Sequence, residues 1–541
     1  MLPERYYLDY FHYLLDFVSQ YYRSILDVRE WNFLEEFASL SIDAQALYVR
    51  MINRKGIFFK PHHFRYTEIS SVKEATEELL ARNFMKEVGD LEIFEKVDYL
   101  DSYTKDQLLQ GFFTTATRNE KKEQLISRLI RQFAWQEVLD VLQTIDKTYQ
   151  LLKRELVEWF FFLFFGYSEK HLTEFVLRDL GRVRFEYAQH NNFVPRFTQR
   201  QDVYHQFLAR QQYALFKKML PYVSIESLLT WYKEQWSLWE KFSGQARYFI
   251  DKLSLRLGQF LEKEGKTDEA LTIYAQTDLP PARERRVRLM LKQYQHEQAL
   301  TLCHEIWRNP ANADELLLAI DTIEKYQGKK FKKTTTAFLE NATTISLVKT
   351  EESIERCVLR YFREQGEDGF FAENHLWNAL FGLAFWDVIF DKAHAHHPLE
   401  RYPYDFGKED FFEQRREKFL QKAQIFDQPN LLQQIVFQTF EQKRGTANPL
   451  LNWHDETCIH LEKLFQHVQT AQLKEVVLQM AKDLKNYAKG FPDLFVFGQR
   501  GGRFVEIKSP TDQLSAQQLY WIQFFQRIGI SVEVVRVRWK D

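Results

Sequence analysis

The feature that most constrains this chain is a pair of short strand-like segments near its C-terminal end. The first covers residues 490–497 and the second 504–508, and a glycine-rich turn at 498–503 separates them. This arrangement predicts a β-hairpin. Because side chains alternate along a strand, Glu506 and Lys508 are expected on one face of the hairpin, and the residue between them on the other.

An acidic residue, Asp493, stands where the first strand begins. Asp493, Glu506 and Lys508 can therefore meet at one edge of a small sheet. Two carboxylates on neighbouring strands repel each other unless a cation lies between them, and hard cations such as Mg²⁺ prefer oxygen ligands. A nearby lysine can orient a metal-bound water or neutralise charge that develops on a phosphate. The alternative is an ordinary surface hairpin with scattered charges.

The sequence after the hairpin favours the first interpretation. A turn at 509–515 leads into a helix that ends near Gly529, and residues 532–537 have the pattern of a further strand. The order strand, strand, helix, strand is the core of the PD-(D/E)xK nucleases. The segments Gly490–Leu494 and Phe504–Gln518 resemble the narrower VRR-NUC version of that domain. The resemblance implies a nuclease site.

Composition limits the remaining possibilities. A chain of 541 residues is too long for one core and indicates about 3 to 5 domains. The 3 cysteines lack zinc-type spacing, no signal peptide is apparent, and the aromatic run 159–165 is too short to span a bilayer. We therefore expect a reducing interior as the setting, and no membrane partner. The family resemblance described below implies a cytoplasmic, bacterial nucleoid-associated protein. The formal net charge of −2 neither favours nor excludes nucleic acid.

Helical periodicity dominates the residues before the hairpin. The expected fold is mostly α and multidomain, with helical N-terminal and TPR-like domains followed by a C-terminal α/β PD-(D/E)xK (VRR-NUC) domain. The expected domains are a DNA-binding domain at 1–135, a helical linker domain at 136–245, TPR-like repeats at 246–340 and the nuclease domain at 341–541. Helices expected at 100–109 and 120–130 form a SAP-like module within about 97–131. The TPR-like pattern rests on an internal echo between 261–274 and 291–303.

Several polar residues are candidates for contacts with DNA. Basic residues alternate with aromatic ones at 48–65, and further lysines lie in the SAP-like module and just before Asp493. The candidates are Arg50, Arg54, Lys55, Lys105, Lys121, Lys122, Lys485, Lys489 and Gln518. A solvated basic face over an aromatic core is the alternative for 48–65. Gln518 could equally touch Lys508, touch a substrate phosphate, or serve as a helix cap.

Two further groups could bind a metal. Glu373 interrupts an apolar helix expected over 370–390, where an acid is normally excluded unless it has a partner. It is either a salt-bridged or helix-start carboxylate, or a metal ligand supplied to Asp493 and Glu506. The histidines at 394, 396 and 397 precede a proline and lack a paired ligand motif, so we expect an exposed loop there.

Taken together, these segments resemble the Fanconi-associated nuclease family over nearly the whole chain. The resemblance implies a structure-directed DNA nuclease that cuts 5′ flaps, trims from 5′ ends and helps to unhook interstrand crosslinks. It also implies Mg²⁺ or Mn²⁺ held by Glu373, Asp493, Glu506 and the carbonyl of Ile507, with Lys508 as the catalytic lysine. The absence of a Cys/His finger indicates the bacterial form, without a ubiquitin-binding module. Ser509 stands where many members have glycine.

Branched or 5′-flapped double-stranded DNA is thus the expected partner. Two other functions remain open at this stage. One is a Holliday-junction resolvase, and the other is a TPR-type adaptor that binds DNA or protein without catalysis. Base-specific recognition is not expected, because the sequence contains no zinc finger or recognition-helix motif.

Overall fold

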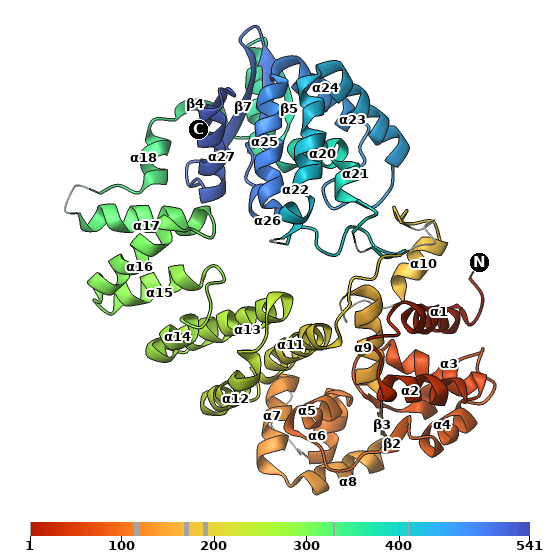
Figure 1. The fold of residues 1–541 in the computed structure, drawn as a ribbon. Helices are drawn as coiled ribbons and strands as arrows, with labels where there is room; N and C mark the ends of the chain where they lie inside the picture. The colour runs from red at the N-terminus through yellow and green to blue at the C-terminus, as the bar shows by residue number, and fades with distance from the viewer. Residues whose placement is uncertain are drawn as a thin grey trace. The chain divides into compact units, whose positions relative to one another are not determined.

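The structure is a computed structural model that describes residues 2–112, 120–166, 172–187, 193–327, 331–394, 396–408 and 410–540. The chain divides into two compact units (Figure 1). Unit 1 comprises Met1–Arg182 and Pro195–Arg256, and unit 2 comprises Val183–Val194 and Leu257–Asp541. Within the described ranges, no helix is both long and apolar enough to cross a membrane.

Unit 1 is built mainly of helices around an aromatic core. Its elements are α1 (Tyr6–Tyr21), α2 (Val28–Ala38), α3 (Ile42–Ile52), β1 (Phe58–Phe59), η1 (Pro61–His63), α4 (Val72–Ala81), β2 (Met85–Glu87), α5 (Ile93–Asp101), α6 (Lys105–Phe112), α7 (Lys122–Gln132), α8 (Trp135–Ile145), β3 (Tyr149–Leu151), α9 (Arg154–Phe165), α10 (Thr173–Asp179), α11 (Arg200–Met219) and α12 (Ile225–Trp239). The run 159–165 forms the buried end of α9, as expected. The three strands pair antiparallel in the order β1-β3-β2.

The helix expected at 100–109 is instead two helices, α5 and α6. Thr104 explains the break, because it starts a reciprocal cap: Gln107 N donates to Thr104 Oγ1 at 3.2 Å and Thr104 N donates to Gln107 Oε1 at 2.9 Å. A capping box of this kind gives side-chain hydrogen-bond partners to the first amides of a new helix, so α6 starts here and does not continue α5. The second expected helix is present as α7.

The segment with the internal echo forms consecutive packed helices. They are α13 (Gly244–Lys263), α14 (Thr267–Tyr274), α15 (Ala282–Lys292), α16 (His296–Arg308) and α17 (Ala313–Tyr326). From α14 onward each helix packs on the next, and the small residues Ala270 and Ala299 are fully buried. This is the arrangement of helical hairpins that the echo predicts.

The C-terminal half of unit 2 contains a five-stranded mixed sheet with helices on both faces. Its elements are α18 (Thr334–Glu340), β4 (Thr343–Val348), α19 (Ile354–Glu364), β5 (Asp368–Phe371), α20 (Glu373–Ala384), α21 (Trp386–Ile389), α22 (Phe411–Lys422), η2 (Ala423–Asp427), α23 (Pro429–Lys443), α24 (Glu456–His467), α25 (Thr470–Lys482), α26 (Leu484–Tyr487), β6 (Leu494–Gly498), β7 (Gly501–Lys508), α27 (Ala516–Arg527) and β8 (Val532–Lys540). The strand order is β4-β8-β7-β6-β5. The predicted hairpin, following helix and last strand are confirmed. The helix expected over 370–390 is shorter, because β5 extends to Phe371 and a break at Phe385 separates α20 from α21.

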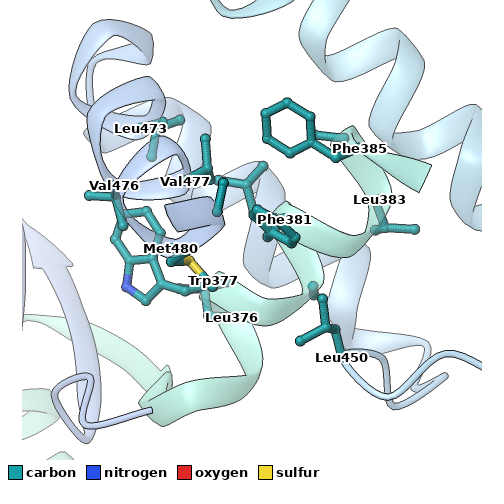
Figure 2. Close-up of a cluster of buried hydrophobic side chains, with 14 of the residues drawn as sticks. Leu376, Trp377, Phe381, Leu383, Phe385, Leu450, Leu473, Val476, Val477 and Met480 are labelled. Carbon is teal, nitrogen blue, oxygen red and sulfur yellow. The ribbon is translucent and has the colours of Figure 1, made fainter. Parts of the chain in front are cut away.

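Alternation along the strands gives the sheet two apolar faces. One face, which includes Leu494, Val505 and Ile507, packs on α19. The other carries Phe495 and Phe504 into a larger core shared with α20, α25 and α27. Figure 2 shows part of this core, where Trp377 and Phe381 of α20 point toward Val477 and Met480 of α25. The core therefore fixes the start of α20 against the hairpin.

Candidate functional site

Asp493 and Glu506 face each other across the hairpin. Leu494 pairs with Val505 in the antiparallel β6–β7 ladder, so the next residues outward, Asp493 and Glu506, are cross-strand neighbours. Both lie on the face that carries Phe495 and Phe504, at the end where β6 begins. The register therefore brings both carboxylates to the same face and the same end of the hairpin.

Glu506 lies on β7, the middle strand of the sheet, and is 0 % exposed. Lys508 Nζ is 2.8 Å from Glu506 Oε1, which is an ion-pair distance. Apart from this ion pair, neither carboxylate oxygen has a hydrogen-bond partner among the described residues. A buried carboxylate with so few partners is costly, and a bound cation lowers that cost.

The two acids resist ionisation when no cation is present. Burial, together with the charge of Asp493, raises the pKa of Glu506 to about 8, against the lowering effect of Lys508. Burial also raises the pKa of Asp493 to about 6, against the lowering effect of the Ile507 amide. The charge of Glu373 adds to the rise at both sites. All the donors are oxygens, so the pair fits a hard divalent cation such as Mg²⁺ or Mn²⁺.

The backbone of Ile507 faces the same position. Ile507 N donates to Asp493 Oδ2 at 2.7 Å. Asp493 immediately precedes the first residue of β6, so this amide bonds to a side chain and not to a strand carbonyl. In an extended strand, the N–H and C=O of one residue point to the same side. The Ile507 carbonyl therefore points toward Asp493 as well, which suits the ligand role that the family resemblance implies.

Glu373 is the first residue of α20 and is tied to the hairpin through its backbone. Its amide donates to the carbonyl of Asp493 at 3.1 Å, and its Oε1 accepts from Asn374 Nδ2 at 3.1 Å. In the described part of the chain, the oxygens of Glu373, Asp493 and Glu506 are not all within 4.8 Å of one another. Glu373 is therefore a carboxylate at the start of a helix, which was one of the two alternatives. Its side chain is exposed and begins next to Asp493 in the structure.

Lys508 is held by the helix that follows it. Its Nζ donates to Gln518 Oε1 at 3.0 Å, and the same oxygen accepts from Ser515 N at 3.0 Å. Ser515 Oγ in turn accepts from Gln518 N at 3.2 Å, which completes a capping box at the start of α27. Gln518 therefore serves as a cap and as a partner of Lys508 at once.

A close contact that the sequence did not indicate fixes α27 against the hairpin. Gly490 has φ +84°, and a Cβ at this position would lie 2.6 Å from Cβ of Gln517. Gln517 Nε2 also donates to Asp314 Oδ2 at 2.7 Å, so α27 contacts the start of α17. Gly490 and Asp314 thereby position the residue next to Gln518.

A buried ion-pair network that sequence reasoning missed lies further along the hairpin. Arg503 donates to both oxygens of Glu367 at 2.7 Å and to Glu533 at 2.6 Å, and Arg500 also contacts Glu367. The hydrogen bond from Arg503 lowers the pKa of Glu367 to about 2. The network connects β7 to β8 and to the segment before β5, so it braces the strands that carry the acids.

Among the N-terminal DNA-binding candidates, some have internal partners. Arg50 pairs with Glu68 and lies over the rings of Tyr7 and Tyr66. Lys122 pairs with Asp101 at 2.7 Å.

The other N-terminal candidates are at least partly accessible. Arg54, Lys55 and Lys121 are exposed, with Arg54 over the ring of Phe64, and Lys105 is half-buried. Beside the acids, Lys485 and Lys489 are exposed, and the Lys489 carbonyl accepts from Trp521 Nε1.

The expectation of an exposed histidine loop is wrong. His396 and His397 are 5 % and 3 % exposed, respectively, and the His396 ring packs against Tyr187 with centroids 4.6 Å apart and the ring planes tilted by 31°. His394 is half-buried next to Asp391. Burial against aromatic partners distant in sequence is not visible in the local pattern.

Comparison with known proteins places the site in a family. Residues 427–539 match the VRR-NUC domain, and residues 5–86 match the FAN1 HTH domain. The Fanconi-associated nuclease 1 homolog of Pseudomonas aeruginosa is 29% identical over 99% of this chain and 97% of its own length. The structure of paFAN1 bound to 2nt 5′flap DNA with gap has a TM-score of 0.81 and 27% identity, covering 100% of this chain and 99% of that one. The chain carries the VRR-NUC and FAN1 HTH domains and is similar to Fanconi-associated nucleases over nearly its whole length.

Other members of the Fanconi-associated nuclease family match over smaller shares. The Arabidopsis thaliana homolog is 22% identical over 99% of this chain and 67% of its own length. Human Fanconi-associated nuclease 1 is 30% identical over 34% of this chain and 19% of its own length. The protein is thus a nuclease, a phosphodiesterase with a mostly helical body and a VRR-NUC domain, and its metal dependence follows from the PD-(D/E)xK type of that domain.

Proposed function

We propose that this nuclease is a 5′ flap endonuclease and 5′-to-3′ exonuclease that acts in the repair of interstrand crosslinks. Its similarity to paFAN1, solved with 5′-flap DNA, over the whole of this chain carries the choice of substrate. The buried carboxylate of Glu506, opposite Asp493 and beside Lys508, carries the choice of chemistry.

Glu373, Asp493, Glu506 and the Ile507 carbonyl are the proposed ligands of Mg²⁺ or Mn²⁺. When bound, the ion supplies Lewis-acid polarisation of the scissile phosphate and a nucleophilic water at neutral pH. Asp493 and Glu506 contribute negative charge from adjacent strands, and Glu373 adds a third carboxylate from the start of α20. The amide of Ile507 keeps Asp493 oriented through the 2.7 Å hydrogen bond.

Lys508 is the proposed catalytic lysine. Its ammonium, held by Gln518, orients the attacking water and donates to an oxygen of the phosphate as negative charge develops there. Because the lysine is only 7 % exposed, its interaction with that charge is weakly screened by solvent.

The helical regions are the proposed determinants of DNA structure. We assign phosphate contacts to the exposed Arg54, Lys55 and Lys121 in the N-terminal region, and to Lys485 and Lys489 near the acids. Such contacts position the duplex without reading its sequence. The expected division at about 135, 245 and 340 separates these regions from the VRR-NUC domain.

A panel of labelled DNA substrates tests the proposal. Purified protein is incubated in Mn²⁺ with 5′-flapped, 3′-flapped, nicked and four-way DNA, beside a Lys508→Ala control that retains the acids. Cutting of the 5′ flap ahead of the other substrates, lost in the control, supports the proposal. Preferred cutting of the four-way junction would instead indicate a resolvase. Binding without any cutting by the wild type would indicate an adaptor.

A further inference from the structure

Two histidines and an aspartate converge in unit 1, whereas the nuclease acids belong to unit 2. His62 and His63 end the short helix η1, and Asp146 follows α8. His62 Nε2 lies 2.9 Å and His63 Nε2 lies 3.0 Å from the same oxygen, Oδ1 of Asp146. The two rings have centroids 4.3 Å apart. Within the described ranges, this is the one group of three or more His, Cys, Asp or Glu residues whose ligand atoms all lie within 4.8 Å.

The sheet of unit 1 brings these residues together. Phe58 pairs with Gln150 and Phe59 with Tyr149 in the antiparallel β1–β3 ladder. This pairing places the segment after β1, which contains η1, next to the segment before β3, which contains Asp146. Beyond the ladder the chain turns into η1, so strand pairing brings the two segments close and the turn of η1 directs both histidine rings to Asp146.

The carboxylate of Asp146 is already oriented on its other side. Its Oδ2 accepts from Lys60 Nζ at 3.0 Å and from Gln107 Nε2 at 3.4 Å, and the Asp146 side chain is only 9 % exposed. Lys60 is itself fixed over the ring of Tyr103, 3.8 Å from the centroid. Outer donors that hold a carboxylate in this way are typical of metal ligands. Oδ1 is left facing the two imidazole rings.

We propose that His62, His63 and Asp146 bind a transition-metal ion of the zinc type, with water completing its coordination. Two imidazole nitrogens and one carboxylate oxygen suit Zn²⁺, whereas Mg²⁺ prefers oxygen ligands alone. Ligand atoms bonded at about 2.0–2.2 Å to one tetrahedral ion lie about 3.3–3.6 Å apart. The two nitrogens lie 2.9 and 3.0 Å from the oxygen, so an ion would need only a small opening of the cluster. The chain thus has two metal sites of different chemistry.

The bound ion would act as a clamp between distant segments. It would join the end of η1 to the end of α8, and so close a loop of chain that contains α4, β2 and α5 to α8. Closing a long loop in this way stabilises the folded state. Because the histidine side chains are 47 % and 60 % exposed, the site is open to solvent, and an ion can enter without unfolding.

The ammonium of Lys60 opposes binding through its charge. We therefore expect the wild-type site to bind Zn²⁺ with modest affinity. A substitution that removes the positive charge of Lys60 but keeps a hydrogen-bond donor should raise that affinity. Lys60→Gln provides that change. We expect it to tighten Zn²⁺ binding about tenfold.

The test uses the full chain with Asp493→Asn and Glu506→Gln, so that the nuclease site does not add to the signal. Metal-free protein is titrated with Zn²⁺ at neutral pH by calorimetry, and Co²⁺ absorption serves as a second measure of nitrogen ligation. We expect one Zn²⁺ per chain, a rise in melting temperature on binding, and loss of both in His62→Ala/His63→Ala. His454→Ala, which removes an exposed histidine elsewhere, should leave the stoichiometry unchanged.

Equal Zn²⁺ binding by the double-histidine variant and its parent would overturn the proposal. So would the absence of Zn²⁺ binding by the parent, which would leave an ordinary histidine–carboxylate interaction. Asp146→Asn separates the contributions of charge and fold: it should weaken Zn²⁺ binding at least tenfold while preserving the circular dichroism of the parent. Unchanged affinity in this variant would also count against the site.

Discussion

The buried carboxylate of Glu506 should make the metal-free protein less stable as the pH rises. A group whose pKa is higher in the folded state binds more protons there, so the free energy of unfolding falls with pH above its unfolded pKa. For Glu506 this fall begins near the ordinary value of 4.5 and ends above about 8. Glu506→Gln removes the ionisation and keeps the shape.

The magnitude follows from the same shift. A rise of one pKa unit is worth about 1.4 kcal/mol, so a rise from 4.5 to about 8 corresponds to roughly 5 kcal/mol at most. Local relaxation and water entry reduce such penalties, so we expect Glu506→Gln to stabilise metal-free protein by roughly 2–3 kcal/mol at about pH 9. Near the unfolded pKa, the variant and the wild type should have similar stability.

Urea titrations with a chelator, performed on both proteins at several pH values, measure this difference. Saturating Mn²⁺ should stabilise the wild type by about 3 kcal/mol at a hundred times its dissociation constant, and should not stabilise the variant. If Glu506→Gln destabilises the metal-free protein equally at all pH values, then Glu506 is not held as a strained acid and the argument for the cation site fails.

Three further outcomes are expected. Lys508→Met should abolish cleavage and retain the Mn²⁺-dependent rise in melting temperature; loss of both would make the lysine structural. Glu367→Gln should show the opposite pH dependence to the Glu506 variant, because the hydrogen bond from Arg503 lowers the pKa of Glu367 to about 2. We expect the variant to lose roughly 3 kcal/mol of unfolding free energy at neutral pH, and this loss should disappear as the pH falls from about 4.5 toward 2. In urea titrations, a pH-independent loss would contradict this. Asp314→Ala should lower kcat with little change in KM on flap DNA, because it frees Gln517 next to the lysine partner; an unchanged kcat would show that α17 does not position the site.

The hairpin could be predicted because its determinants are local: alternation along the two strands shows which side chains share a face. Its register could not, because Gly498 pairs with Gly501 and the turn is shorter than the expected 498–503; this shorter turn is what puts Asp493 opposite Glu506. The complete burial of Glu506 could not be predicted in the same way. It depends on β7 being the middle strand, and hence on β4, whose pairing with β8 joins residues almost 200 positions apart.

Other features depend on partners that no local pattern reveals. Lys60 lies in the basic and aromatic segment 48–65, yet its ammonium pairs with the carboxylate of Asp146, which comes after the SAP-like helices in the sequence. His396 and His397 appear solvent-exposed in sequence and are buried in unit 2. Which acid pairs with which base, and which aromatic ring packs against which, depends on the folded core and not on the spacing of the residues along the chain.

The tight fit at Gly490 has a consequence for how variants of this enzyme should be interpreted. Any side chain there would push Gln517, and α27 with it, away from the strand that carries Lys508. A protein altered at this glycine would keep every acid and the lysine and still be inactive. Genetic surveys that judge such nucleases by their reactive groups alone would score it as functional, although the damage is one of shape.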